Sequence, residues 1–213
     1  MAQATRLLVL GVVRIFQPVH GYDVRRELVT WHVEDWASIA PGSVYNALKT
    51  LTKEGMLEVV GTDHVGKRPE RTTYRLTPFG EQELADLLRD QLWTVRHPVD
   101  PLIAAISLMG FIARDELISA LEARAAQVKG MVQHFEYSIA AVDNITTPDH
   151  VREMMRLISA RLAAELPWSK ALIARLKAGE YNTLGDPHWQ PGPPLAKLPA
   201  KKSAAKKKPK NKR

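Results

Sequence analysis

Apolar residues recur every three or four positions along most of this chain, which is the spacing of amphipathic helices. The pattern predicts helices over residues 4–16, 22–31, 42–53, 78–93, 101–111, 115–142 and 148–178. Between the third and fourth helices the period changes, and two short β-type runs, 56–60 and 71–76, flank a turn-rich basic segment. The predicted fold class is therefore mainly α with a small β-wing.

The third helix has a start and a stop in its sequence. Pro41 suits the first turn, where its missing N–H costs nothing, and Gly55 suits the position past the end, where a positive φ is needed. Its inward stripe consists of Val44, Leu48 and Leu51. Its other face carries Ser43, Tyr45, Asn46, Lys49 and Lys53. Such a face either contacts the major groove of DNA or is the solvated side of a core helix, and the helix alone does not decide.

The second half of the chain reads as a helical domain. Residues 101–111 are nearly all apolar, which predicts a buried helix. Helices 115–142 and 148–178 carry continuous apolar stripes, and Pro167 should kink the second of them. The remaining elements are too few to cover both stripes, so we expect a homodimer.

The net charge of +7 belongs to one segment. Residues 197–213 hold nine of the 30 basic residues and no acid, which leaves 21 basic against 23 acidic residues elsewhere. We expect residues 181–213 to be a disordered tail, rich in Pro and Gly and then in Lys. Its cations are suited to non-specific DNA binding.

Several functional classes find no support in the sequence. There is no Cys, no apolar run of about 18 residues and no recognisable leader, so we expect a cytoplasmic protein without a membrane partner. The seven His are scattered without metal-ligand spacing, and no nucleophile elbow, phosphate loop or zinc-protease motif occurs. We therefore expect no enzyme activity, no catalytic residue, no metal and no cofactor.

Five blocks of sequence, in order and at matching spacing, resemble the PadR-type transcriptional regulators. They are His20–Tyr22, Pro41–Leu51, Glu54–Leu57, Gly66–Pro69 and Tyr74–Gly80. Residues 99–178 are similar, in pattern and length, to the longer helical domain of one branch of that family. The resemblance implies a winged helix-turn-helix protein that is homodimeric, binds double-stranded DNA and usually represses transcription.

The resemblance also implies which residues contact DNA. The third helix would place Ser43, Tyr45, Asn46 and Lys49 in the major groove, the wing would present Lys67, Arg68 and Arg71, and Tyr22 would contact the backbone. Two residues depart from the family pattern. Asn46 stands where Pro is frequent, and Glu70 puts an acid in a usually basic wing.

These observations predict four regions: a DNA-binding domain over 1–80, a linking helix over 81–97, a helical dimerisation domain over 98–180, and the tail over 181–213. The predicted function is that of a homodimeric repressor, whose release by a small hydrophobic or phenolic effector would fit the family. The alternative is a nucleoid-associated architectural protein that binds DNA through its Lys-rich tail.

Overall fold

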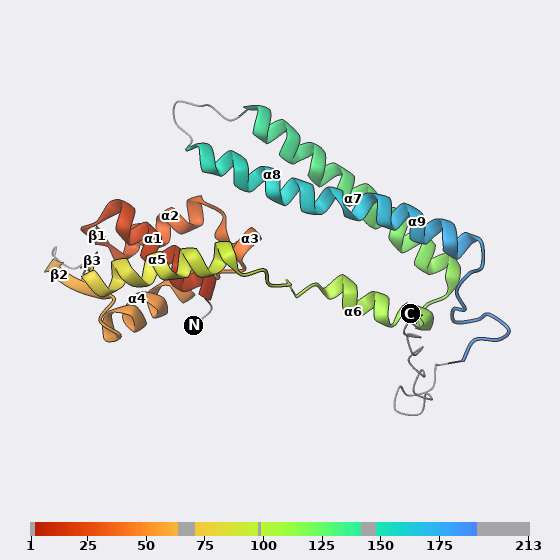
Figure 1. Cartoon of the computed structure of the whole chain (residues 1–213), viewed down its shortest axis with the longest axis horizontal. Helices are drawn as coiled ribbons and strands as arrows, with labels where there is room; N and C mark the ends of the chain where they lie inside the picture. Colours follow the sequence, from red (N-terminus) through yellow and green to blue (C-terminus); the bar gives the residue numbers. More distant parts are fainter. Residues whose placement is uncertain (1–2, 64–70, 98, 142–147, 191–213) are drawn as a thin grey trace, which may run out of the picture. The chain divides into compact units, whose positions relative to one another are not determined.

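The computed structural model describes residues 3–63, 71–97, 99–141 and 148–190 (Figure 1). The chain divides into two compact units, residues 1–98 and 99–213, which we treat separately. No helix in the described part of the chain is both long and apolar enough to cross a membrane.

The first unit contains the predicted helices and strands and two short additions. Its elements are α1 (Gln3–Phe16), β1 (Val19–His20), α2 (Gly21–Thr30), α3 (Val33–Ala37), α4 (Ser43–Lys53), β2 (Leu57–Asp63), β3 (Arg71–Leu76) and α5 (Pro78–Trp93). β1 and α3 are the additions, and both are too short to show a periodic pattern. β1 pairs antiparallel with β3, which gives a three-stranded sheet in the order β1-β3-β2.

The core of the first unit lies between α1, α2, α4 and the sheet. α1 contributes Val9, Leu10, Val12 and Val13, and α4 contributes Val44, Ala47, Leu48 and Leu51, all buried. α5 is held at its start, where the Thr77 hydroxyl accepts from the Gly80 N–H as an N-cap. Gly80 is required there, because an added Cβ would lie 2.1 Å from the Met56 carbonyl oxygen.

The second unit is helical throughout: α6 (Pro101–Ser107), the 3-10 turn η1 (Met109–Phe111), α7 (Arg114–Ala141), α8 (Asp149–Ala163) and α9 (Glu165–Lys177). α7 runs alongside both α8 and α9 (Figure 1). Leu117 and Leu121 of α7 pack with Leu172 and Leu176 of α9 in its core. The long helix predicted over 148–178 is interrupted at Ala164, just before Pro167. Proline lacks the N–H and crowds the carbonyl four residues earlier, which accounts for the interruption.

Residues 101–111 differ from the expectation of a buried helix. Ile103, Leu108 and Phe111 are 68%, 61% and 55% exposed, and α6 has no buried residue. α6 has only two turns, and its Ile106 packs against the core while the opposite side faces outward. The prediction that residues 101–111 form a buried helix is therefore wrong for the single chain.

Residues 181–190, expected at the start of a disordered tail, are instead packed on the second unit. Thr183 is fully buried, Tyr181 packs against the core and Leu184 forms a β-bridge with Ala113. Polar contacts of Arg114 and Asp186 and two isolated aromatic rings, Tyr181 and Trp189, hold this segment, and such contacts have no helical or strand period that the sequence could show. The remainder of the expected tail, 191–213, lies outside the described residues.

Candidate nucleic-acid interface

α4 has one buried side and one exposed side. At 3.6 residues per turn, Asn46, Lys49 and Lys53 fall within an arc of about 60° on the exposed side, opposite the buried stripe. Tyr45 and Ser43 lie on either edge of that arc, and Tyr45 is 42% exposed. We call Asn46, Lys49 and Lys53 with these two edge residues the α4 face.

The Ser43 side chain is hydrogen-bonded within its own turn. Its hydroxyl donates to the Ala40 carbonyl oxygen at 2.7 Å, and its backbone N–H donates to the same oxygen at 2.9 Å. The Ser43 hydroxyl in this position offers lone pairs to a ligand. Asn46 is less constrained: its carbonyl oxygen accepts from the Thr50 hydroxyl, and its exposed amide side chain has no hydrogen bond within the described residues.

The start of α2 lies against α4 and β3. Gly21 is buried there, and an added Cβ would lie 3.1 Å from Leu48 Cδ1, 3.2 Å from Tyr74 Cε2 and 3.8 Å from Tyr45 Cε1. The absence of a side chain at Gly21 therefore allows this close approach. Tyr22, which follows, is 56% exposed.

β1 holds the start of α2 in place. Val19 and His20 pair with Tyr74 and Thr73 of β3, and the Thr73 hydroxyl lies 2.9 Å from His20 Nδ1. The sheet thus connects the strand that leaves the wing to the first turn of α2, where the exposed ring of Tyr22 lies.

The wing is described only in part. Arg71, the first residue of β3, is exposed and pairs in register with Asp63 of β2. Lys67 and Arg68, the other predicted wing cations, lie outside the described residues, as does Glu70. Farther from the tip, Arg75 and Glu58 form an ion pair at 2.8 Å across the two strands. That pair leaves Arg75 with its charge compensated within the sheet.

The charges around α4 favour an anion. Within the described residues, no carboxylate pairs with Lys49 or Lys53. The nearest acid along the chain, Glu54, pairs with Arg6 of α1, which also binds Glu83 of α5 at 2.5 Å. Partial burial lowers the pKa of Arg6, but its hydrogen bonds to Glu54 and Glu83 outweigh that effect and raise the pKa above the usual value. At the end of α4, Glu54 is therefore paired with a cation of α1, whereas no described carboxylate binds the two ammonium groups of Lys49 and Lys53.

Two cations outside the predicted set, Lys53 and Arg25, also form no ion pair within the described residues. Lys53 shares the arc of Asn46 and Lys49, and its spacing of four from Lys49 was a sufficient signal. Arg25 of α2 is partly buried and forms no ion pair within the described residues. Arg26, by contrast, is bound to Asp23 at 2.8 Å and lies 5.9 Å from the Tyr22 ring centroid.

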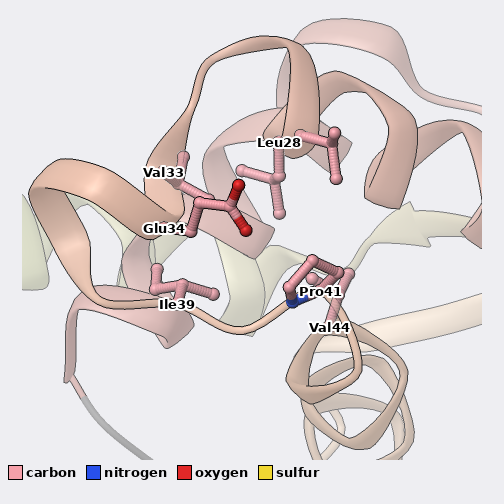
Figure 2. Close-up of a pocket in the computed structure, with 7 residues that line it drawn as sticks. Leu28, Val33, Glu34, Ile39, Pro41 and Val44 are labelled. Carbon is pink, nitrogen blue, oxygen red and sulfur yellow. The ribbon is translucent and has the colours of Figure 1, made fainter.

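A small apolar recess lies between α2, α3 and the start of α4. Figure 2 shows Glu34 of α3 reaching across it toward the α2 side, with Pro41 and Val44 opposite. Its volume, about 10 Å³, is the space of roughly one water molecule. The recess is therefore a packing feature of the helix-turn-helix and is too small for an organic ligand.

The helices α2 and α4 with the β2–β3 wing define the class: this is a winged helix-turn-helix protein with a helical second unit, as predicted. Residues 9–86 match the profile of the Transcriptional regulator PadR-like family. The resemblance to this family seen in the sequence is therefore confirmed over residues 9–86. No curated protein matches the chain.

Solved structures share the fold across both units. Bacillus subtilis PadR in complex with operator DNA is 22% identical, with a TM-score of 0.59 over 80% of this chain and 98% of that chain. The same protein in complex with p-coumaric acid is 20% identical, with a TM-score of 0.58 over 82% and 96%. The Vibrio cholerae virulence activator AphA is 18% identical, with a TM-score of 0.54 over 82% and 99%. At 18–22% sequence identity, these structures show that the fold is shared.

Proposed function

We propose that this PadR-like regulator is a homodimeric repressor that binds operator DNA with α4 in the major groove. The observation that carries the proposal is the α4 face, whose amide and two ammonium groups are exposed and have no ion-pair partner within the described residues. An exposed face with two ammonium groups that no described carboxylate binds is suited to a polyanion. The solved complex of Bacillus subtilis PadR with operator DNA supports the same partner.

The roles of the contacts differ by chemistry. Asn46 reads adenine by a bidentate hydrogen bond, because its amide offers a donor and an acceptor together. Lys49, Lys53 and Arg71 bind phosphates and supply affinity and register. Tyr22, Tyr45 and Ser43 contact the backbone at the edges, and Lys67 and Arg68 extend the contact from the wing. Two copies of α4 would then enter half-sites about 34 Å apart.

A second copy of this chain is the proposed cover for the exposed apolar side chains of α6 and η1. Ile103, Leu108 and Phe111 would leave water on dimerisation, which stabilises association in proportion to the apolar area removed. Light scattering should report about twice the chain mass of 23.8 kDa. A mass of one chain at micromolar concentration would reject the homodimer.

A phenolic or other planar apolar effector is the proposed signal. The second unit has a hollow of about 350 Å³ beside α6, whose lining includes one aromatic ring, one guanidinium and two carboxylates. Its lining comprises Asp100, Leu102, Ile103, Ile106, Arg161, Ala164, Glu165 and Trp168. The p-coumaric acid in the complex of Bacillus subtilis PadR is an effector of the proposed kind, with a planar ring and a carboxylate. Titration with p-coumaric acid should quench Trp168, and Arg161→Gln should weaken the effect.

Selection of bound DNA from a random pool tests the main proposal. The expected result is a palindromic consensus that the protein protects in a footprint, and a reporter carrying that site should be repressed. Activation of the reporter would reverse the sign of regulation, and AphA, a virulence activator, is an example of an activator with this fold. Binding without any sequence preference would overturn the regulator and support the architectural alternative.

A further inference from the structure

The hollow of about 350 Å³ in the second unit depends on α6 for part of its lining. α6 supplies Leu102, Ile103 and Ile106, and the rest comes chiefly from α8 and α9. α6 has seven residues, none of them buried, and among them Ile106 is the one that packs against the core of the described unit. Few buried contacts are typical of an element that opens locally. The position of α6 therefore depends on what holds its ends.

The two ends of α6 are held differently. At its start, the Asp100 carboxylate accepts from the Leu102 N–H at 2.8 Å, which is a contact within the helix itself. At its end, residues 108–113 connect α6 to α7. The chain turns back after α9 (Figure 1), and residues 180–190, which we call the strap, lie along this connection.

The strap contacts the connection at three positions. Trp189 lies edge-on against Phe111, with ring centroids 5.2 Å apart. Trp189 Nε1 also lies close to Gly110, where an added Cβ would be 3.3 Å from it. Leu184 forms a parallel β-bridge with Ala113, directly before α7. The backbone that leads out of α6 is therefore supported by the strap.

The strap itself is fixed to the core helices by Arg114, the first residue of α7. Its guanidinium donates to the Tyr181 carbonyl oxygen at 2.7 Å, to the Asp186 carboxylate at 2.7 Å and to the Leu176 carbonyl oxygen of α9 at 2.5 Å. Asp186 also accepts from the Thr183 N–H at 2.7 Å and from the Thr183 hydroxyl at 3.0 Å. Hydrogen bonds between charged groups are among the strong ones, so the strap is a firm support for the connection.

We propose that α6 is a lid over the hollow, that residues 108–113 are its hinge, and that the strap holds this hinge so that α6 stays closed on the hollow. Arg114, Asp186 and Trp189 are then positioning residues, which act on the hollow through α6 without lining it. This rests on the proposed function for the ligand of the hollow, a planar aromatic carboxylate.

The lid links the strap to ligand affinity. With α6 closed, the side chains of Leu102, Ile103 and Ile106 can contact the ligand, and with α6 displaced these contacts are lost. The apparent affinity therefore falls in proportion to the closed fraction of molecules. The coupling is reciprocal, so the ligand in turn stabilises the closed position of α6 and the strap that holds it.

A distance measurement between spin labels tests the hinge without any ligand. The chain has no Cys, so Ala104→Cys on α6 and Lys170→Cys on α9, both at exposed positions, give two labelling sites in the full chain. The distance distribution should be narrow in this labelled parent. Asp186→Ala and Trp189→Ala should each broaden it toward longer distances. His188→Ala, an exposed neighbour in the strap, is the matched control and should leave it unchanged.

A strap that only ties α7 to α9 would lower the free energy of unfolding without moving the labels. Unchanged label distances in folded Asp186→Ala and Trp189→Ala would therefore overturn the proposal. If Asp186→Ala loses helix content by circular dichroism, Trp189→Ala decides alone, because it leaves the contacts of Arg114 in place. Trp189→Phe keeps a ring against Phe111 and should recover most of the narrow distribution.

Calorimetry with p-coumaric acid tests the consequence for the hollow. Asp186→Ala should raise the dissociation constant about tenfold if it lowers the closed fraction tenfold, and His188→Ala should not change it. The ligand should also narrow the label distribution of Asp186→Ala. Equal affinity in all variants despite displaced labels would overturn the role of the lid. Displaced labels with no binding of p-coumaric acid by any variant would support the strap and hinge and reject the phenolic effector of the proposed function.

Discussion

Arg6 of α1 forms an ion pair with Glu54, the residue directly after the last turn of α4. The same guanidinium binds Glu83 of α5, so one side chain joins the end of the proposed recognition helix to the helix that leads out of the first unit. Arg6→Met leaves two carboxylates facing each other without a cation and should destabilise the protein by about 1–2 kcal/mol. Glu54→Gln should cost less, about 0.5–1 kcal/mol, because Glu54 is partly exposed. Urea unfolding measures both, and a larger loss for Glu54→Gln would contradict this ranking.

Two glycines of the first unit should respond to alanine in opposite directions. Gly80→Ala places a Cβ 2.1 Å from the Met56 carbonyl oxygen and must displace α5, at a cost of about 3 kcal/mol or more. Gly11, inside α1, has nothing within 4 Å of an added Cβ, so Gly11→Ala should stabilise by about 0.5–1 kcal/mol. Thermal unfolding followed by circular dichroism compares the two variants. Equal effects would show that the approach of α5 to Met56 is not tight.

The α4 face should separate affinity from sequence preference. Lys49→Ala should weaken binding to every duplex by a similar factor and reduce the salt slope by about 1. Asn46→Ala should cost about 1–3 kcal/mol at one base position and relax the preference there. Anisotropy titrations on the selected site and on single-base variants distinguish the two. Lys170→Ala, on the exposed side of α9, is the matched control and should change neither quantity.

Dimerisation should depend on the exposed side of α6. Ile103→Asp puts a charge where the proposed interface excludes water, which should raise the dimer dissociation constant at least about tenfold. Ala126→Asp, on an exposed position of α7, is the control for added charge. Sedimentation velocity over a concentration series gives both constants. If Ile103→Asp dimerises like the control, the interface lies elsewhere.

Residues 180–190, the strap that Arg114 holds against the start of α7, should open in acid. The N–H of Thr183, its hydroxyl and Arg114 hold the pKa of Asp186 below its usual 3.8. Because the folded pKa is depressed, Asp186 stabilises the strap above pH 3.8, and this contribution is lost as the pH falls through the lower, folded value. The emission of Trp189 in a variant that retains only that tryptophan should shift to the red in this range. Asp186→Asn should remove the shift, whereas a shift that persists would assign the acid transition to another group.

The sequence by itself determined the architecture of the first unit. The 3.6-residue period of α1 and α4, the β-type runs of β2 and β3, and the Thr77-Pro78 start of α5 are local signals, and each predicted the element that formed. The resemblance to PadR-type regulators lay in the same local blocks. β1 and α3 were not predicted, because elements of two and five residues are too short to show a periodic pattern.

Only the tertiary structure decided which charged side chains form ion pairs within the protein and which apolar side chains stay exposed. Nothing in the sequence distinguishes Arg75 or Glu54 from neighbouring charged residues. Arg75 pairs with Glu58 because β3 lies beside β2, and Glu54 pairs with Arg6 because α1 lies beside the end of α4. The exposure of α6 likewise depends on what packs over it, since an apolar run does not specify its cover. The strap is the clearest case: Arg114 and Asp186 are 72 residues apart, and a polar contact across that distance leaves no periodic trace.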